Sequence, residues 1–291
     1  MLTRFNIAYE KLKIHDDQTL VSSDWQGWNR GILSELPGAT DFNYIFVPSI
    51  LNTMYGSPSV IVDLIVPKLR DMLMGREDAD DILASIVPTA SGGAGHIMFD
   101  DNVTSPDLLN KLYQWLRFTD ACSIDDSNIR SIVEFGSGYG ALALVLKRML
   151  PGITYTIVET PVVGAVAYQY LQDSLRETVH ISTESIVPTC VNIVPTSKMD
   201  IIKNADVFIS QGALCEAPDS VVDKVISTGW FGAKSGMLII WEHAKILAGL
   251  KVNSKAVNIQ PFDEWKGQNF VFFTQAAKTR SRKPKQQGGA Q

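Results

Sequence analysis

Cysteine is scarce in this chain of 291 residues, and long apolar runs are missing from it. The three cysteines, Cys122, Cys190 and Cys215, lie far apart and form no CxxC pair. This spacing argues against a disulfide framework or a zinc knuckle, and it favours reduced thiols in a cytoplasmic compartment. No stretch reaches about 18 apolar residues, and the polar beginning lacks the apolar core of a signal peptide. We therefore expect neither a membrane span nor a secretory leader.

An excess of positive charge is also missing. The chain has 26 Lys and Arg against 31 Asp and Glu, a formal net charge of -5. Such a balance gives no global field that attracts nucleic acid, so a nucleic-acid partner is not favoured. The local exception is the basic end, residues 278–291, which we interpret as a disordered tail, with contact to RNA or to an acidic surface as the alternative.

The first third of the chain reads differently from the rest. Aromatic residues are frequent there, and residues 57–74 carry apolar side chains at helical spacing, with Pro67 expected to kink or split the helix. We interpret residues 1–90 as a helical cap or dimerisation region, which leaves a homodimer open. A glycine-rich hinge follows, and a helix should then begin with Ser105 as N-cap and Pro106 in its first turn.

From residue 131 onward, strands and helices alternate. We expect strands at 131–135, 155–158, somewhere within 179–195, at 206–210 and at 237–241, helices at 139–150, 162–174 and 218–228, and an antiparallel closing pair at 255–259 and 269–274. This alternation predicts an α/β fold with a Rossmann-like, mostly parallel sheet and an antiparallel closing strand. We assign residues 91–277 to this domain.

A glycine-rich turn follows the first of these strands. In Glu134-Phe135-Gly136-Ser137-Gly138-Tyr139-Gly140 a strand enters a tight turn and a helix leaves it. The glycines let the backbone approach a ligand, and the helix N-terminus offers free N–H donors. The alternatives are a dinucleotide site and a tight turn without a ligand.

Two carboxylates discriminate between these alternatives. Glu134 stands two residues before the first glycine and suits the ammonium and sulfonium of S-adenosylmethionine. Glu159 ends the next strand, 21 positions after Gly138, where an acid can accept both ribose hydroxyls of an adenosine. Together they predict an S-adenosylmethionine-dependent methyltransferase.

The chain resembles the class I methyltransferases and, within them, the bacterial putative sugar O-methyltransferase family. The glycine turn, Ile157-Val158-Glu159-Thr160-Pro161 and the segment from Asp206 to Glu216 carry the resemblance. The family's typical Ser is replaced by Ala213, and its typical Met by Ala217. We expect the following residues to bind the cofactor: Glu134, Gly136, Ser137, Gly138, Tyr139, Gly140, Glu159, Thr160, Ser210 and Gln211.

A hydroxyl acceptor needs a base beyond the carboxyl ends of the strands. Glu216 follows the fourth predicted strand, and the resemblance also places it near the acceptor. His243 follows the fifth strand, and His96 follows the glycine-rich hinge, from which it could close over the site. The alternatives are a helix-start acid for Glu216 and ordinary loop residues for the two histidines. We expect no metal ion, because the adjacent acid pairs, Asp100-Asp101 and Asp125-Asp126, precede the first strand of the sheet.

The preferred reading is an O-methyltransferase acting on a sugar or glycan hydroxyl, with Trp25 and Trp28 either stacking on the sugar or packing in the core. An RNA cap-type enzyme and a small-molecule methyltransferase are alternatives. A methyltransferase-like scaffold without catalysis is a fourth, although the intact turn and both acids argue against it.

Overall fold

The computed structural model describes residues 2–41, 43–55, 57–93, 95–175, 179–241, 243–262 and 267–274. The expected tail at 278–291 lies outside the described residues.

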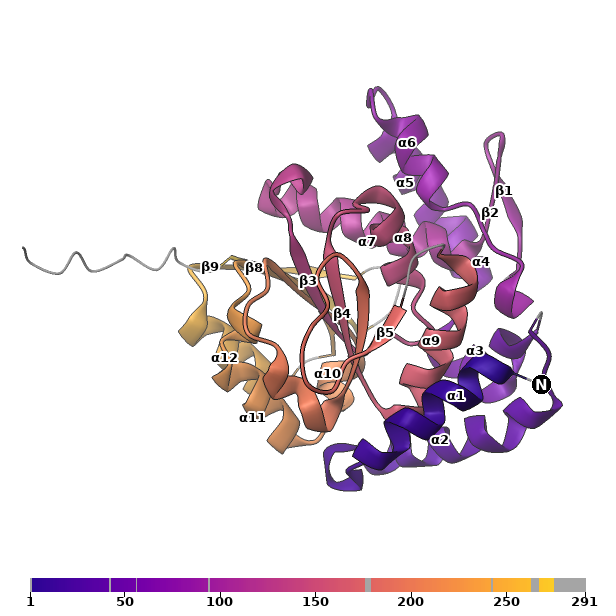
Figure 1. The fold of residues 1–291 in the computed structure, drawn as a ribbon. Helices are drawn as coiled ribbons and strands as arrows, with labels where there is room; N and C mark the ends of the chain where they lie inside the picture. The colour runs from indigo at the N-terminus through magenta and orange to yellow at the C-terminus, as the bar shows by residue number, and fades with distance from the viewer. Residues whose placement is uncertain are drawn as a thin grey trace, which may run out of the picture.

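An eight-stranded sheet forms the centre of this described part, in the order β5-β6-β4-β3-β7-β8-β10-β9 (Figure 1). Neighbouring strands are parallel except at β10, which is antiparallel to both β8 and β9. The predicted α/β class is confirmed, with the antiparallel closing pair where it was expected. The strands are β3 Ser131–Phe135, β4 Thr154–Glu159, β5 Val179–Ile181, β6 Val191–Pro195, β7 Val207–Gln211, β8 Ser235–Ile240, β9 Ala256–Pro261 and β10 Asn269–Thr274.

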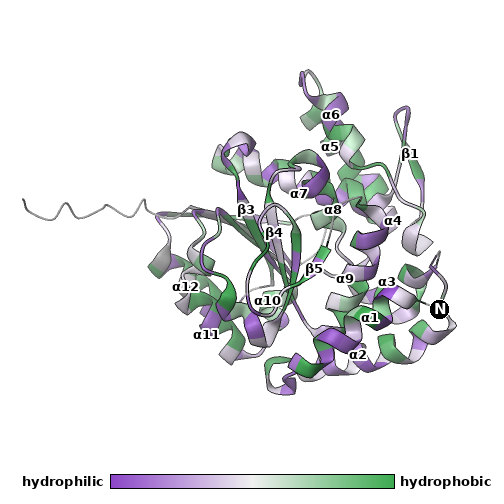
Figure 2. Cartoon of the chain, viewed as in Figure 1, coloured by the Kyte–Doolittle hydropathy of each residue, from purple (hydrophilic) through white to green (hydrophobic). Residues whose placement is uncertain are grey.

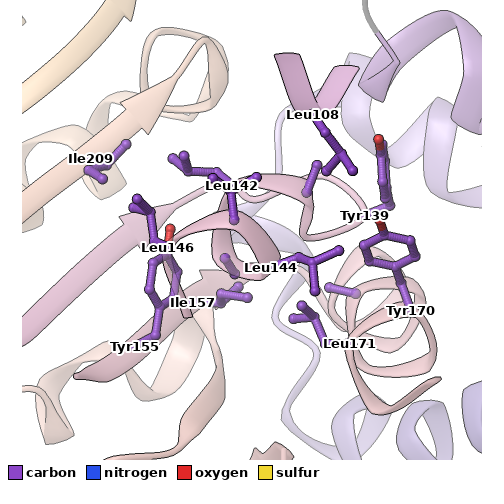
Figure 3. Packing of buried hydrophobic residues seen from close by; sticks show 14 of the residues in the cluster. Leu108, Tyr139, Leu142, Leu144, Leu146, Tyr155, Ile157, Tyr170, Leu171 and Ile209 are labelled. Carbon is purple, nitrogen blue, oxygen red and sulfur yellow. The ribbon is translucent and has the colours of Figure 1, made fainter. Parts of the chain in front are cut away.

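Helices cover both faces of the sheet, which is why its central strands are apolar on both sides. Ile132 and Ile157 pack on one face with α7, α8 and α9, whereas Val133 and Val158 pack on the other with α11 and α12. Figure 2 shows the resulting apolar strands, and Figure 3 shows α8 and α9 side chains packed among those of β4 and β7. These helices are α7 Pro106–Cys122, α8 Ala141–Met149, α9 Pro161–Ser174, α10 Ala213–Glu216, α11 Asp219–Ser227 and α12 Ala244–Asn253.

The N-terminal region is helical, and its buried side chains belong to the same apolar cluster as the sheet. Its helix α1 packs along α9, where the backbone N–H of Phe5 donates to Gln169 Oε1 at 2.9 Å. The region contains α1 Thr3–Leu12, α2 Ser23–Glu35, α3 Pro48–Met54, α4 Pro58–Val60, the π-helix η5 Ile61–Ile65, α5 Val66–Leu73 and α6 Ala79–Ser85. The division at residue 90 and a dimerisation role stay predictions.

Short 3₁₀ turns connect these elements. They are η1 Lys13–His15, η2 Gln18–Leu20, η3 Leu36–Gly38, η4 Tyr44–Phe46, η6 Ser91–Gly93, η7 Asp126–Asn128, η8 Thr196–Ile201 and η9 Trp230–Gly232.

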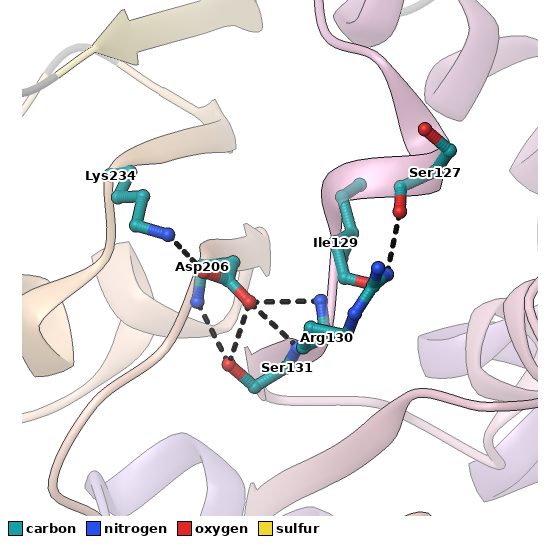
Figure 4. A network of polar contacts seen from close by, with 6 residues as sticks. All are labelled: Ser127, Ile129, Arg130, Ser131, Asp206 and Lys234. Carbon is teal, nitrogen blue, oxygen red and sulfur yellow. Dashed lines mark hydrogen bonds and ion pairs between the residues drawn. The ribbon is translucent and has the colours of Figure 1, made fainter.

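A polar network fixes the amino ends of the central strands (Figure 4). Asp206 Oδ2 accepts from the backbone N–H groups of Arg130 and Ser131 at 2.9 and 3.0 Å, and Lys234 Nζ donates to Oδ1 at 2.6 Å. One carboxylate therefore ties together the starts of β3, β7 and β8. Asp206 therefore lies at the amino end of β7, remote from the carboxyl ends of the strands.

Several local features differ from expectation. The third strand is a pair, β5 and β6, and the short hairpin of β1 Ile97–Phe99 and β2 Asn102–Thr104 was not anticipated. Pro67 lies in the first turn of α5, directly after the π-helix. Proline has no backbone N–H to donate to the carbonyl one turn earlier, so the regular helix is interrupted at this point. Among the described residues, the helical stretch Pro48–Leu73, which includes α3 to α5, is a weak candidate membrane span by length and composition. Three of its residues, Ile61, Ile65 and Leu69, pack in the protein core.

Candidate functional site

A large cavity lies at the carboxyl ends of β3, β4 and β7. Its volume is ≈ 1370 Å³, and the glycine turn, the N-terminal helices, and Phe262 and Gln268 next to the closing strands all contribute to its wall. Single small-molecule sites usually occupy about 300–1,000 Å³. The cavity therefore has room for two ligands side by side.

The glycine turn forms the floor of the cavity through Gly136, Ser137 and Gly138. Gly136 has a φ of +77°, and a Cβ built on it would lie 1.8 Å from Ala213 Cβ. A Cβ on Gly138 would lie 3.2 Å from Met54 Cβ in α3. Glycine is thus required at Gly136 both by the backbone conformation and by the close approach of α10.

Glu159 braces this turn from the end of β4. Its Oε2 accepts from the backbone N–H of Ser137 at 2.9 Å, and its Oε1 accepts from that of Thr160 at 2.8 Å. Burial raises the pKa of Glu159 to about 7, although these backbone donors lower it. The Gly138 N–H and the Thr160 hydroxyl also lower its pKa, and the side chain lines the cavity.

Glu134, expected to meet the ligand's ammonium, takes another position. It shares a strand face with Ile132, since side chains alternate along β3, and it is 1% exposed behind the cavity wall. The Tyr155 hydroxyl donates to its Oε2 at 2.8 Å. Burial raises the pKa of Glu134 to about 7, against the lowering effects of Tyr155 and the charge of Lys111. Direct ligand contact by Glu134 is therefore not supported, and the partner that its burial requires is Tyr155.

The other predicted cofactor residues divide into two groups. Thr160 and Gln211 line the cavity together with the glycine turn and Glu159. Tyr139 is a core residue whose hydroxyl donates to Asp107 Oδ2 at 2.5 Å, and Ser210 Oγ accepts from Leu214 N at 3.1 Å. Gly140 precedes α8 and packs against Leu171. These last three shape the turn and the strand end rather than the cavity surface.

The lining of the same cavity also contains acceptor candidates. Glu216 and His96 both line the cavity, as do Trp25 and Trp28. Trp25 Nε1 donates to Glu216 Oε2 at 2.7 Å across 191 positions of sequence. The N-terminal helix α2 therefore contributes directly to the wall beside the candidate base.

His243 is not part of this wall. Its Nδ1 accepts from the backbone N–H of Ile246 at 3.4 Å and so caps the start of α12. This contact favours the alternative in which His243 has an ordinary structural role, although as a helix cap and not as the loop residue that was expected. Within the described ranges, no three His, Cys, Asp or Glu side chains gather as metal ligands would, and metal independence stays a prediction.

Sequence reasoning missed the contribution of α7. Four of its polar residues line the cavity at positions i, i+3, i+4 and i+7: Asp107, Asn110, Lys111 and Gln114. The helix was expected only for its apolar face. The same spacing rule, applied to the polar residues of a helix that is otherwise apolar, could have found this second face.

Comparison with known proteins gives structural neighbours only. No family model matches the chain, and no curated protein matches it. The N-terminal domain of human METTL16 in complex with SAH is similar over 85% of this chain and 93% of that chain, at 13% identity and a TM-score of 0.41. Mitomycin 7-O-methyltransferase MmcR is similar over 86% and 68%, at 16% identity and 0.39.

A further neighbour is the magnesium protoporphyrin IX methyltransferase ChlM from Synechocystis PCC 6803 with bound SAM. It is similar over 72% of this chain and 97% of that chain, at 12% identity and a TM-score of 0.41. At values this low, the neighbours identify neither an activity nor an acceptor, which have to be argued from the residues of the site.

Proposed function

We propose that this chain is an S-adenosylmethionine-dependent O-methyltransferase whose acceptor is a sugar or glycan hydroxyl. One observation carries the proposal. A single cavity is lined both by the glycine turn with Glu159 and by Glu216 with nearby tryptophans.

The cofactor half of the cavity suits an adenosine. Glu159 lines the cavity as an acceptor for ribose hydroxyls, and Phe135 and Val158 give the wall an apolar surface for the base. The Thr160 hydroxyl lies beside Glu159 in the same lining, and its interaction with the carboxylate lowers the pKa of Glu159. When bound, the cofactor supplies a methyl group on a sulfonium.

The other half suits a neutral acceptor with several hydroxyl groups. Trp25, Trp28 and Trp241 present flat apolar rings on which the C–H face of a sugar can lie. Among the described lining residues, Asp24, Asp107, Glu159 and Glu216 are acidic and Lys111 is the basic one. This surplus of acids disfavours a polyanion such as RNA.

Glu216 is the residue that we assign as base. One of its oxygens is held by Trp25, which leaves the other to accept the acceptor's proton. In the transfer, the acceptor oxygen forms a bond to the methyl carbon, the carbon–sulfur bond breaks with its electrons going to sulfur, and the hydroxyl proton moves to the carboxylate. His96 lines the same cavity and is the second candidate for this proton.

Titration calorimetry with S-adenosylhomocysteine tests the cofactor half. We expect binding by the wild type, strong weakening in Glu159→Ala, and no change in Glu10→Ala, an exposed acid of α1. The absence of binding below the millimolar range would overturn the proposal and favour a scaffold.

The acceptor half is tested by offering methyl-labelled S-adenosylmethionine with monosaccharides, disaccharides, nucleosides and capped RNA. We expect label on a sugar, lost in Glu216→Gln and retained in His243→Asn. Label on capped RNA alone would replace the sugar by a nucleic acid as acceptor.

A further inference from the structure

The polar residues of α7 form a stripe on a helix that is otherwise buried among apolar side chains. Asp107, Asn110 and Gln114 are 1%, 4% and 2% exposed, and Lys111 lies between them on the same face. All four line the cavity. Burying polar groups is unfavourable unless they are hydrogen-bonded. Gln114 Nε2 donates to Asn110 Oδ1 at 2.9 Å, whereas Asp107 Oδ1 has no hydrogen-bond partner, so the need for a polar ligand lies at the Asp107 end of the stripe.

Lys111 carries an ammonium with unused capacity. Its Nζ donates to Gln211 Oε1 at 2.7 Å, and Gln211 in turn donates to Gln114 Oε1. These hydrogen-bond partners are neutral amides. The charge of Lys111 also lowers the pKa of the buried Glu134, but in the described part of the chain no carboxylate forms an ion pair with Lys111. Because an ammonium has three donors, two remain for an anion.

Asp107 lies one helical turn earlier. Its Oδ2 accepts from the Tyr139 hydroxyl, whereas its Oδ1 is buried without a hydrogen-bond partner. Leaving a buried carboxylate oxygen unpaired is costly. Although residues at i and i+4 can pair, Asp107 and Lys111 form no ion pair with each other, among the interactions of the described residues. An acid and a base therefore face one cavity separately.

We propose that Asp107 and Lys111 form a clamp for the amino-acid end of S-adenosylmethionine. Asp107 binds the ammonium and Lys111 binds the carboxylate. This inference rests on the proposed function and specifies its cofactor site. The position of Lys111 agrees with this role, because its partner Gln211 ends β7, and β7 is the neighbour of β3, the strand that enters the glycine turn. The clamp also replaces Glu134, which Tyr155 holds behind the wall.

Two ligands that differ only at this end provide the test. S-Adenosylhomocysteine carries the amino-acid end, and 5′-methylthioadenosine has the same nucleoside and a sulfur but lacks it. In titration calorimetry we expect Lys111→Met to weaken the first ligand by about 10- to 100-fold and to leave the second unchanged, since a charge-assisted bond is lost. Lys111→Arg should retain most of the affinity, and Lys203→Met, at an exposed lysine, should match the wild type.

Asp107→Asn provides an independent arm, with the same selective loss expected. The clamp is overturned if both variants keep the wild-type affinity ratio of the two ligands, or if they lose both ligands equally. A wild type that binds neither ligand would instead refute the proposed function. If the wild type binds both ligands and the variants keep the wild-type ratio of the two affinities, the clamp is refuted and the proposed function stands.

Discussion

Replacing Gly136 with alanine probes the contact between the glycine turn and α10. The new Cβ would lie 1.8 Å from Ala213 Cβ, on a backbone with a φ of +77°. Two penalties add: about 1–2 kcal/mol for a left-handed L-residue, and about 1–3 kcal/mol for a methyl group forced into filled space. We expect the free energy of unfolding, measured by urea denaturation, to fall by about 2–5 kcal/mol.

A second substitution separates the two penalties. Ala213→Gly removes the clashing methyl group, and the next atom, Ala213 Cα, lies at an ordinary 3.4 Å. The double variant should therefore recover the packing penalty of about 1–3 kcal/mol and keep the backbone penalty. Gly152→Ala is the matched control, because a Cβ there meets nothing within 4 Å. A Gly136→Ala variant as stable as the wild type, or a double variant no more stable than the single one, would refute this reasoning.

Three further outcomes are expected. Trp25→Phe keeps an aromatic ring but loses the N–H that donates to Glu216. We expect kcat for methyl transfer to fall about tenfold or more, with the affinity for S-adenosylhomocysteine unchanged. An unchanged kcat would contradict the idea that Trp25 positions Glu216. Lys147 donates to three backbone carbonyls, at 2.7, 3.0 and 2.9 Å, so Lys147→Met should lower stability in urea by about 3 kcal/mol or more, and an unmoved midpoint would count against it. Burial raises the pKa of Glu159 to about 7, and only its ionised form accepts both hydroxyl hydrogens; S-adenosylhomocysteine affinity should rise from about pH 6 to about pH 8, and a flat profile in the wild type would exclude this role. The pKa of Glu159 is 4.5 in the unfolded chain and about 7 in the folded protein. Its contribution to the free energy of unfolding is therefore fully present below pH 4.5 and is lost as the pH rises through about 7.

The sheet and the glycine turn were predictable because local sequence dictates them. Strands β3 and β4 are buried on both faces and read as short apolar runs, and the start of α7 follows from Ser105, whose Oγ accepts from Leu108 N at 3.3 Å. The third strand was harder to place, because β5 has three residues and β6 has five.

The interior of the site could be predicted only in part. Glu134 was expected to meet the ammonium of the cofactor, but its partner is Tyr155 of the neighbouring strand. The residues of one strand do not specify its register against the next, so this pairing could not be predicted. The bond between Trp25 and Glu216 spans 191 positions, and no local rule brings two such residues together. The stripe that includes Lys111 was visible as a pattern, but its meaning depends on the cavity opposite it.

The bond between Trp25 and Glu216 also constrains how the molecule is made. The ribosome releases the first helices long before the strands against which they pack. At about 5–20 residues per second, the 191 positions between the two partners correspond to roughly 10–40 s of synthesis. During that interval α2 can pack against α3 and later against α9, but its bond to Glu216 forms only after β7 has emerged. The part of the cavity wall that joins Trp25 to Glu216 is therefore completed late in synthesis.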